Sequence, residues 1–332
     1  MLQPLIDLLK SLRDEKVSLV THAGGDPDSV GASVALKSLI HHLSPRAAVD
    51  IVIPEAPTAR SRRMLNYLGS QAKTKIDKDA STIILVDIGS VMKLRQVAAE
   101  IAQGNRMVVV LDHHVPVERY PANARNFVDE EKSSTCEIVY DLCQLASYPI
   151  SKKDAEAIFG GMYFDSARLA LASTETLRKM ADLAALGVNP AKVIENLQVP
   201  MDRSEKIARL KAAQRARILD LNGKIAAVSY VGSFQSSAAR ALLSLGADIS
   251  IVGGESKGAV AVALRSTPSF HRDTKVNLAR DIAAVLGERF SGAGGGHVSA
   301  AGVVCRGQLE DVLQDAVQIA TESVDRSKAH PS

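Results

Sequence analysis

Seven side chains that can bind cations follow three apolar segments in the first half of the sequence. Almost no lysine or arginine accompanies them, so bound cations are the simplest way to offset the repulsion among their carboxylates. Carboxylate and imidazole ligands without thiolates suit Mn²⁺, Fe²⁺ or Zn²⁺. The sequence therefore predicts a metal site. The seven residues are His22, Asp26, Asp28, Asp87, Asp112, His113 and His114.

Some of these residues also have a structural explanation. Asp26 precedes Pro27, and an aspartate cap followed by proline is common at the start of a helix. Asp87 ends an apolar segment and could cap the helix that follows. Paired histidines directly after an apolar segment, as at His113 and His114, have no common packing role. Taken together, the residues favour a metal site over separate structural roles.

Apolar, strand-like runs alternate with helical patterns in the first half of the chain. Such alternation predicts an α/β fold with a doubly wound, mainly parallel sheet, and runs of Val, Ile and Leu are typical of strands covered on both faces. Ligands bind beyond the carboxyl ends of strands in such sheets, which is where the polar residues lie. The expected strands are 16–22, 49–54, 82–89, 106–114 and 125–130, and the expected helices are 28–43, 58–68 and 91–103.

The pattern becomes helical after residue 130, and strands begin again at Gly223. A highly charged helix at 202–219 resembles a connector. We therefore expect a first domain at 1–187, a helical linker or hinge at 188–222 and a smaller α/β domain at 223–325. The expected helices are 133–146, 152–170, 174–186, 190–198, 234–245, 276–287 and 308–321, and the expected strands are the KIAAVSYV segment after Gly223, 249–253 and 259–266.

Composition limits the class of protein. A chain of 332 residues with 46% hydrophobic and 23% charged residues is typical of soluble globular proteins, and two domains are expected at this length. No apolar run approaches the roughly 18 residues of a membrane helix, and the N-terminus resembles an amphipathic helix rather than a secretion signal. We expect a cytoplasmic protein. A net charge of +3 and the absence of tryptophan argue against binding to long nucleic acids.

Other nucleotide and catalytic motifs are absent from the sequence. Three cysteines without a C-x-x-C pair support neither a disulfide framework nor a thiolate zinc site. The glycine-rich stretch ends in His297 and does not complete G-x-G-x-x-G. No P-loop, G-x-S-x-G or H-E-x-x-H sequence occurs.

Six segments, in their order along the chain, resemble the motifs of the DHH phosphoesterases, the family of RecJ-type exonucleases and nano-RNase/pAp phosphatases. Two of them, in the second half, resemble the DHH-associated domain of that family. The segments are HAGGDPD at 22–28, LVDIGS at 85–90, LDHHVP at 111–116, FGGMYFDSARL at 159–169, LRS at 264–266 and GAGGGHVSAAG at 292–302.

The resemblance implies a centre of two metal ions, with Mn²⁺ as the expected ion and Mg²⁺ or Co²⁺ as substitutes. Asp87 would bridge the two ions. Pro27 replaces the usual glycine between two ligands, and the usual D-T-G of the fourth motif reads Asp-Ser-Ala here. The implied ligands are His22, Asp26 and Asp87 for one ion, and Asp28, Asp87, His113 and Asp165 for the other.

The resemblance also implies catalytic and substrate-binding residues. Asp112 would orient a ligating imidazole, as outer carboxylates of metal sites do, and His114 would contact the scissile phosphate. A metal-activated hydroxide would attack phosphorus, which places Asp87, Asp112 and His114 in the catalytic set. The substrate-binding residues expected in the second domain are Arg265, Ser266, Gly294, Gly295, Gly296 and His297, where glycine amides could form an anion nest.

We therefore expect a Mn²⁺-dependent phosphoesterase that hydrolyses phosphodiester or phosphomonoester bonds of short oligonucleotides, pAp-like nucleotides or cyclic dinucleotides. A homodimer is compatible with the sequence, whereas a membrane or long duplex nucleic acid is not an expected partner. Two alternatives stay open. One is a family-II-like inorganic pyrophosphatase, although the GGGH segment argues against it. The other is a nucleotide-binding regulatory module without turnover.

Overall fold

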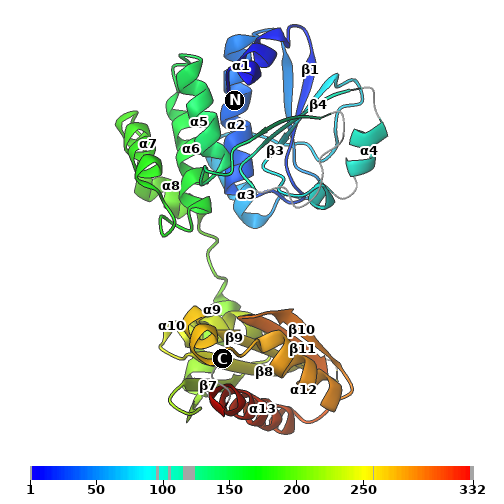
Figure 1. Cartoon of the computed structure of the whole chain (residues 1–332), viewed down its shortest axis with the longest axis vertical. Helices are drawn as coiled ribbons and strands as arrows, with labels where there is room; N and C mark the ends of the chain where they lie inside the picture. The colour runs from blue at the N-terminus through cyan, green and yellow to red at the C-terminus, as the bar shows by residue number, and fades with distance from the viewer. Residues whose placement is uncertain (1, 95–96, 104–105, 115–123, 257, 330–332) are drawn as a thin grey trace. The chain divides into compact units, whose positions relative to one another are not determined.

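The computed structural model describes residues 2–94, 97–103, 106–114, 124–256 and 258–329. The chain divides into two compact units, Met1–Val199 and Pro200–Ser332. Figure 1 colours the first from blue to green and the second from yellow-green to red. Of the segment expected to be a linker, α8 (Pro190–Leu197) belongs to the first unit, and α9 (Arg203–Gln214) and β6 (Arg217–Asp220) belong to the second.

The first unit contains a five-stranded sheet with the order β2-β1-β3-β4-β5, in which every pair is parallel. This confirms the predicted fold class. The strands end slightly earlier than the apolar runs suggest, so that His22 and Asp87 lie just beyond β1 and β3. The strands are β1 (Lys16–Val20), β2 (Ala48–Val52), β3 (Thr82–Val86), β4 (Met107–Asp112) and β5 (Ala124–Val128).

Helices cover both faces of this sheet, which explains its apolar strands. Ile84 and Val86 of β3 face a core formed with α1, α2, α5 and α6, while Ile83 and Leu85 face a second core with α4. Figure 1 shows these two helical layers. The helices are α1 (Leu2–Ser11), α2 (Pro27–Leu43), α3 (Ala59–Tyr67), a 3₁₀ turn (Val91–Leu94), α4 (Val97–Gln103), α5 (Thr135–Leu145), α6 (Lys152–Asp165) and α7 (Thr174–Ala185).

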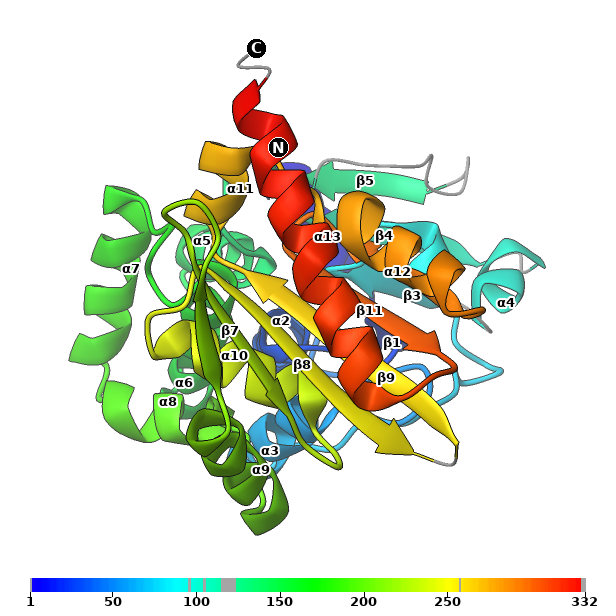
Figure 2. The same cartoon turned by 90° about the horizontal axis from the view of Figure 1, so that it is seen from below.

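The second unit contains a mixed sheet with the order β10-β11-β9-β8-β7-β6, in which only β7 and β8 are parallel. One face packs against the long helix α13, drawn in red in Figure 2, and the other packs against α10. The elements are β7 (Ile225–Tyr230), α10 (Gln235–Ser244), β8 (Ile249–Ser256), β9 (Ala259–Ser266), α11 (Pro268–Thr274), a π-helix (Leu278–Ala283), α12 (Ala284–Arg289), β10 (Ala293–His297), β11 (Ala300–Cys305) and α13 (Leu309–Ala329).

Two helices end several residues before the position that the sequence predicts. The helix expected at 202–219 ends at Gln214, because residues 217–220 form β6 and pair with β7. The helix expected at 152–170 ends at Asp165, because Ala167, Arg168 and Leu169 all have positive φ and form a left-handed turn. A short helix, α11, lies where the sequence indicates only a connecting segment.

The glycine run is an edge strand rather than a tight turn. Its glycines allow β10 to pack closely between β11 and the π-helix, since a Cβ on Gly294 would lie 1.8 Å from the Ala283 carbonyl oxygen. Gly296 has φ +142°, and a Cβ there would lie 2.4 Å from the Ala300 carbonyl oxygen. Among the described residues, no helix is both long and apolar enough to cross a bilayer.

Candidate metal centre

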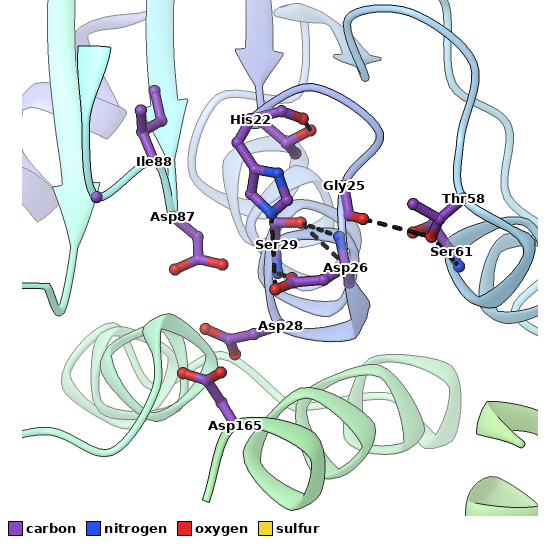
Figure 3. Close-up of polar contacts among 12 residues, drawn as sticks. His22, Gly25, Asp26, Asp28, Ser29, Thr58, Ser61, Asp87, Ile88 and Asp165 are labelled. Atoms are coloured by element: carbon purple, nitrogen blue, oxygen red, sulfur yellow. Dashed lines mark hydrogen bonds and ion pairs between the residues drawn. The ribbon is translucent and has the colours of Figure 1, made fainter. Parts of the chain in front are cut away.

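The carboxyl ends of β1, β3 and β4 place the expected ligands together at one edge of the first sheet. Because these strands are adjacent and parallel, the residues that follow them meet although they are far apart in sequence. Figure 3 shows His22 and the carboxylates of Asp26, Asp28, Asp87 and Asp165 pointing toward a common space. α2 and α6 supply the side chains that the strands do not.

The first ligand pair belongs to the turn between β1 and α2. Asp26 caps α2, and its side chain and that of Ser29 form a reciprocal capping box, with Pro27 at the first helical position. The cap leaves Asp26 Oδ2 3.6 Å from His22 Nε2. His22 Nδ1 lies 3.1 Å from the Ala23 carbonyl oxygen and must donate to it, so the Nε2 lone pair faces the centre. Capping and ligation are therefore compatible roles for Asp26.

Asp28 is fully buried and lies at the N-terminus of another helix, α5. Its Oδ2 accepts from Thr135 N at 2.7 Å and its Oδ1 accepts from Cys136 N at 3.0 Å. Burial, together with the neighbouring carboxylates of Asp165 and Asp26, raises the pKa of Asp28 to about 7. The carboxyl group of Asp28 therefore keeps its proton at mildly acidic pH, and a bound cation could replace that proton.

Asp87 occupies a strained position directly after β3. Its φ is 58°, in the left-handed region that aspartate tolerates better than most residues. The residue is 2% exposed, and its Oδ1 accepts from Thr135 Oγ1 at 3.1 Å. Burial and the surrounding carboxylates, first among them Asp28, raise its pKa well above the ordinary value. Backbone strain at this position fits a functional role.

Asp112 is a buried hub of hydrogen bonds rather than an open ligand. Its Oδ2 accepts from Ile88 N at 2.9 Å and Gly89 N at 2.6 Å, and its Oδ1 accepts from His113 N at 2.8 Å. His114 adds its backbone N and its Nδ1, the latter at 2.8 Å from Oδ1. Burial opposes ionisation, but the bonds from His114 and Gly89 hold the pKa of Asp112 far below its usual value.

The Nε2 atom of His113 faces the carboxylates of Asp165 and Asp87. Its Nδ1 lies 3.2 Å from the Lys132 carbonyl oxygen and must donate to it. Its Nε2 is buried and forms ion-pair contacts with Asp165 Oδ2 at 2.9 Å and with Asp87 Oδ1 at 3.6 Å. Burial disfavours the charged ring, but Asp165 and Asp28 raise the pKa of His113 to about 9. A buried imidazole nitrogen that faces several carboxylates is compatible with a metal ligand.

The donor set fits divalent cations. Candidate ligand atoms lie within 4.8 Å of one another in three groups, and all are carboxylate oxygens or imidazole nitrogens. Asp87 belongs to two of the groups, and so does His113. The raised pKa values of Asp28 and Asp87 reflect the burial and mutual repulsion of these carboxylates, which a cation would offset. The groups are His22, Asp26 and Asp87; Asp28, His113 and Asp165; and Asp87, His113 and His114.

The substrate-binding residues expected in the second unit lie on β9 and β10. Arg265 is already engaged, since its Nη1 donates to the carbonyls of Leu264 at 2.7 Å and Ala301 at 3.2 Å, and its Nη2 donates to Ser236 Oγ at 2.5 Å. Ser266 is buried, and its Oγ has no hydrogen-bond partner. The four expected β10 residues line the outer edge of the sheet, where all but Gly294 are exposed: Gly294, Gly295, Gly296 and His297.

Sequence reasoning missed the residues that hold the ligands. Thr135 and Cys136 bind Asp28, Thr135 also binds Asp87, and Lys132 fixes His113. The only local indication is the Ser134 cap of α5, whose Oγ accepts from Glu137 N at 3.1 Å. A helix cap indicates where a helix begins, but it does not indicate which distant carboxylate the first N–H groups bind.

The sequence of the chain is similar to a known family and to known proteins. The model of the DHH family, N-terminal domain, matches residues 16–188, slightly more than half of the chain. An uncharacterized protein of Methanocaldococcus jannaschii is 28% identical over 299 residues, 90% of this chain and 89% of that protein. A probable bifunctional oligoribonuclease and PAP phosphatase of Streptococcus mutans is 25% identical over 246 residues, 65% of this chain and 76% of that protein.

A solved structure shares the fold over the whole chain. The crystal structure of an exopolyphosphatase-related protein from Bacteroides fragilis has a TM-score of 0.67 at 19% identity and covers 98% of this chain and 97% of that one. The family match extends over the strands and helices that carry the metal-ligand groups. The chain therefore belongs to the DHH phosphoesterase family.

Proposed function

We propose that the chain is a divalent-cation-dependent phosphohydrolase that acts on small nucleotides or short oligonucleotides. One observation carries the proposal. The buried Nε2 of His113 lies 2.9 Å from Asp165 Oδ2 and 3.6 Å from Asp87 Oδ1, beside Asp28 and Asp87, whose pKa values burial and neighbouring carboxylates have raised. Such a site is stabilised by a cation and is costly without one.

The residues divide into two sets of ligands. His22, Asp26 and Asp87 would hold one ion. Asp28, His113 and Asp165 would hold the other, with Asp87 shared. Mn²⁺ is the ion that we propose, with Mg²⁺ or Co²⁺ as substitutes. Divalent ions bound here would provide hydroxide at neutral pH and would offset charge on the phosphoryl oxygens.

Asp112 and His114 form a part of the proposed site that does not depend on a bound metal ion. His114 Nδ1 lies 2.8 Å from Asp112 Oδ1, so the carboxylate accepts from Nδ1 and fixes the orientation of the ring. The side chain of His114 is 38% exposed, against 13% for His113, so His114 is the imidazole open to a ligand. We assign to His114 the contact with the scissile phosphate, where it would stabilise negative charge.

The proposed substrate class rests on two considerations. The Streptococcus mutans relative is named as a probable oligoribonuclease and PAP phosphatase. The net charge of +3 gives no general attraction for long nucleic acids. We propose the exposed edge strand β10 with His297, and Arg265 on β9, as contacts of the nucleotide. Cytoplasmic location and homodimerisation belong to the same proposal.

The test is the release of phosphate or mononucleotide from a panel of pAp, dinucleotides, longer RNA, cyclic di-AMP and pyrophosphate. The wild-type chain is assayed with Mn²⁺, Mg²⁺ or a chelator. We expect turnover of the small nucleotides that the chelator abolishes. Turnover unaffected by the chelator would contradict the metal proposal, and turnover of pyrophosphate alone would contradict the substrate class.

A matched pair of variants tests the ligand assignment. Asp87→Ala should abolish turnover, because it removes the carboxylate common to both ions, while Asp79→Ala should leave turnover unchanged. Asp79 pairs only with the exposed Lys16 and lies outside the centre. Thermal unfolding checks that both variants fold. Retained turnover in Asp87→Ala would refute the bridging role.

A further inference from the structure

Residues 132–136 connect ligands from three separate elements. Lys132 accepts from His113 Nδ1 through its carbonyl oxygen at 3.2 Å. Thr135 and Cys136 donate their N–H groups to Asp28, at 2.7 and 3.0 Å. The Thr135 hydroxyl donates to Asp87 at 3.1 Å. The position of this short segment therefore sets the positions of one ligand from α2, one after β3 and one after β4.

A buried ion pair, Glu137 and Lys179, fixes residues 132–136 through contacts other than those with the candidate ligands. Glu137 Oε2 accepts from Ser133 N at 3.1 Å and from Ser133 Oγ at 2.8 Å, so the carboxylate closes the turn that precedes α5. Glu137 Oε1 lies 3.1 Å from Lys179 Nζ, which comes from α7. The side chains of the pair are 2% and 8% exposed. Thr176 Oγ1 also donates to Glu137, at 3.2 Å.

Further charges extend the pair into a network. Lys179 Nζ lies 2.7 Å from Asp141 and 2.8 Å from Glu175. Lys132 Nζ lies 3.2 Å from Asp141 and 2.8 Å from Glu175, so the residue whose carbonyl fixes His113 is itself held by its side chain. Burial opposes ionisation of Glu137, but Ser133 and Lys179 keep its pKa below the ordinary value. Glu137 is therefore ionised at neutral pH.

Stability alone does not explain a buried network of this kind. Ionised groups lose hydration on burial, and well-packed apolar side chains in place of a buried ion pair are often equally or more stabilising. A network of charge-assisted hydrogen bonds fixes geometry more narrowly than apolar packing does. The bonds of this network end at Lys132 and Ser133, next to the residues that hold the ligands.

We propose that Glu137 and Lys179 are positioning residues of the metal centre. Glu137 and Lys179 contact none of the candidate ligands. They act by fixing the conformation of residues 132–136. Thr135, Cys136 and the Lys132 carbonyl are thereby preorganised to present Asp28, Asp87 and His113 to a cation. The inference rests on the proposed function, since it concerns the affinity of the same centre.

The experiment measures Mn²⁺ binding by calorimetric titration of the full-length protein after removal of metal. Lys179→Met and Glu137→Gln are compared with the wild type and with Asp154→Asn. Asp154 is a matched control because it is a buried carboxylate of the same unit that accepts from Ser38, Tyr148 and Ser151, none of which is a candidate ligand. Lys179→Arg tests whether another positively charged side chain restores the network.

We expect Lys179→Met and Glu137→Gln to weaken Mn²⁺ binding by about 10- to 100-fold, the loss typical of outer partners of metal ligands. Asp154→Asn should lower the melting temperature but leave the Mn²⁺ affinity within about twofold of the wild type, and Lys179→Arg should recover most of the loss. Saturating Mn²⁺ should restore much of kcat in the two network variants, because the ligands themselves remain.

Two outcomes would overturn the inference. One is an affinity within twofold of the wild type in a folded Glu137→Gln protein, which keeps the side-chain volume and serves if Lys179→Met does not fold. The other is an equal loss in Asp154→Asn, which would show general destabilisation. A wild-type protein that binds no Mn²⁺ would instead refute the proposed function, so the two failures are distinguishable.

Discussion

Replacement of Gly161 by alanine tests how tightly α6 must approach the metal centre. A Cβ at Gly161 would lie 2.3 Å from Cys136 Sγ and 2.8 Å from Asp28 Oδ1. Both neighbours are fully buried, and Asp28 is held by two N–H groups of α5. Neither can move without displacing a candidate ligand or the helix that holds it.

The adjacent Gly160 provides a matched control on the same helix. A Cβ there would lie 3.1 Å from Met64 Cε and 3.4 Å from Val193 Cγ1, which are ends of side chains rather than backbone. Alanine in a helix interior is favoured over glycine by about 1 kcal/mol, which applies to both positions. Overpacking a rigid core costs about 1–3 kcal/mol, which applies fully only at Gly161.

The two opposing terms give a net difference. Gly160→Ala should be neutral or stabilising by up to about 1 kcal/mol. Gly161→Ala should lose up to about 2 kcal/mol of unfolding free energy, or up to roughly 8 °C in melting temperature for a unit of this size. Displacement of Asp28 should also weaken Mn²⁺ binding, whereas Gly160→Ala should bind as the wild type does.

The assay is thermal unfolding of both variants with a chelator and with Mn²⁺, combined with calorimetric Mn²⁺ titration. Cys136→Ala in the Gly161→Ala background removes the closest contact and should recover part of the lost stability. The reasoning would be refuted if Gly161→Ala matched Gly160→Ala in both melting temperature and Mn²⁺ affinity, because the close approach would then have no energetic consequence.

Three further predictions follow from the pKa values and hydrogen bonds. The pKa of Asp28 is raised to about 7 in the folded protein from 3.8, so protonation of Asp28 contributes stability that is present below about pH 4 and lost as pH rises through 7. Mn²⁺ should therefore raise the melting temperature more at pH 8 than at pH 5.5, and an equal rise at both pH values would contradict this. Asp112→Asn places an amide among N–H donors and should lower kcat by about 10- to 100-fold, since His114 loses its carboxylate; a steady-state assay at saturating Mn²⁺ measures this, and unchanged kcat would remove the orienting role. Arg265→Ala breaks the bond to Ser236 and should both lower the melting temperature and raise KM, whereas a change in stability alone would make Arg265 purely structural.

Part of the molecule could be predicted from patterns that are local in sequence. Continuous apolar strands alternating with helices predicted the doubly wound parallel sheet, and the structure confirms it. The Asp26-Pro27 pair predicted a helix start, and α2 begins at Pro27. Such patterns are informative because backbone geometry and burial determine which residue types suit each strand, turn and cap.

Other features depend on contacts that no local pattern records. The run Gly294 to Gly296 suggests an anion nest of backbone amides but gives no sign of a strand, yet it forms an edge strand, because the missing Cβ atoms permit close packing against Ala283 and Ala300. Arg265 carries a charge that suits a phosphate, yet it donates to two carbonyls and a serine. A neighbour from another element decides the role in each case.

The same division holds at the metal centre. The candidate donors, carboxylates and imidazoles that follow apolar strands, can be found from the sequence alone, because parallel strands bring their carboxyl ends to one edge. The hydrogen bonds that hold these candidate ligands depend on contacts between distant segments. Thr135 lies 107 residues from Asp28 and 48 from Asp87, and the Glu137–Lys179 pair joins two helices. Such bonds form when packing brings distant elements together, since hydrogen-bond geometry depends on distances in space rather than on spacing along the chain.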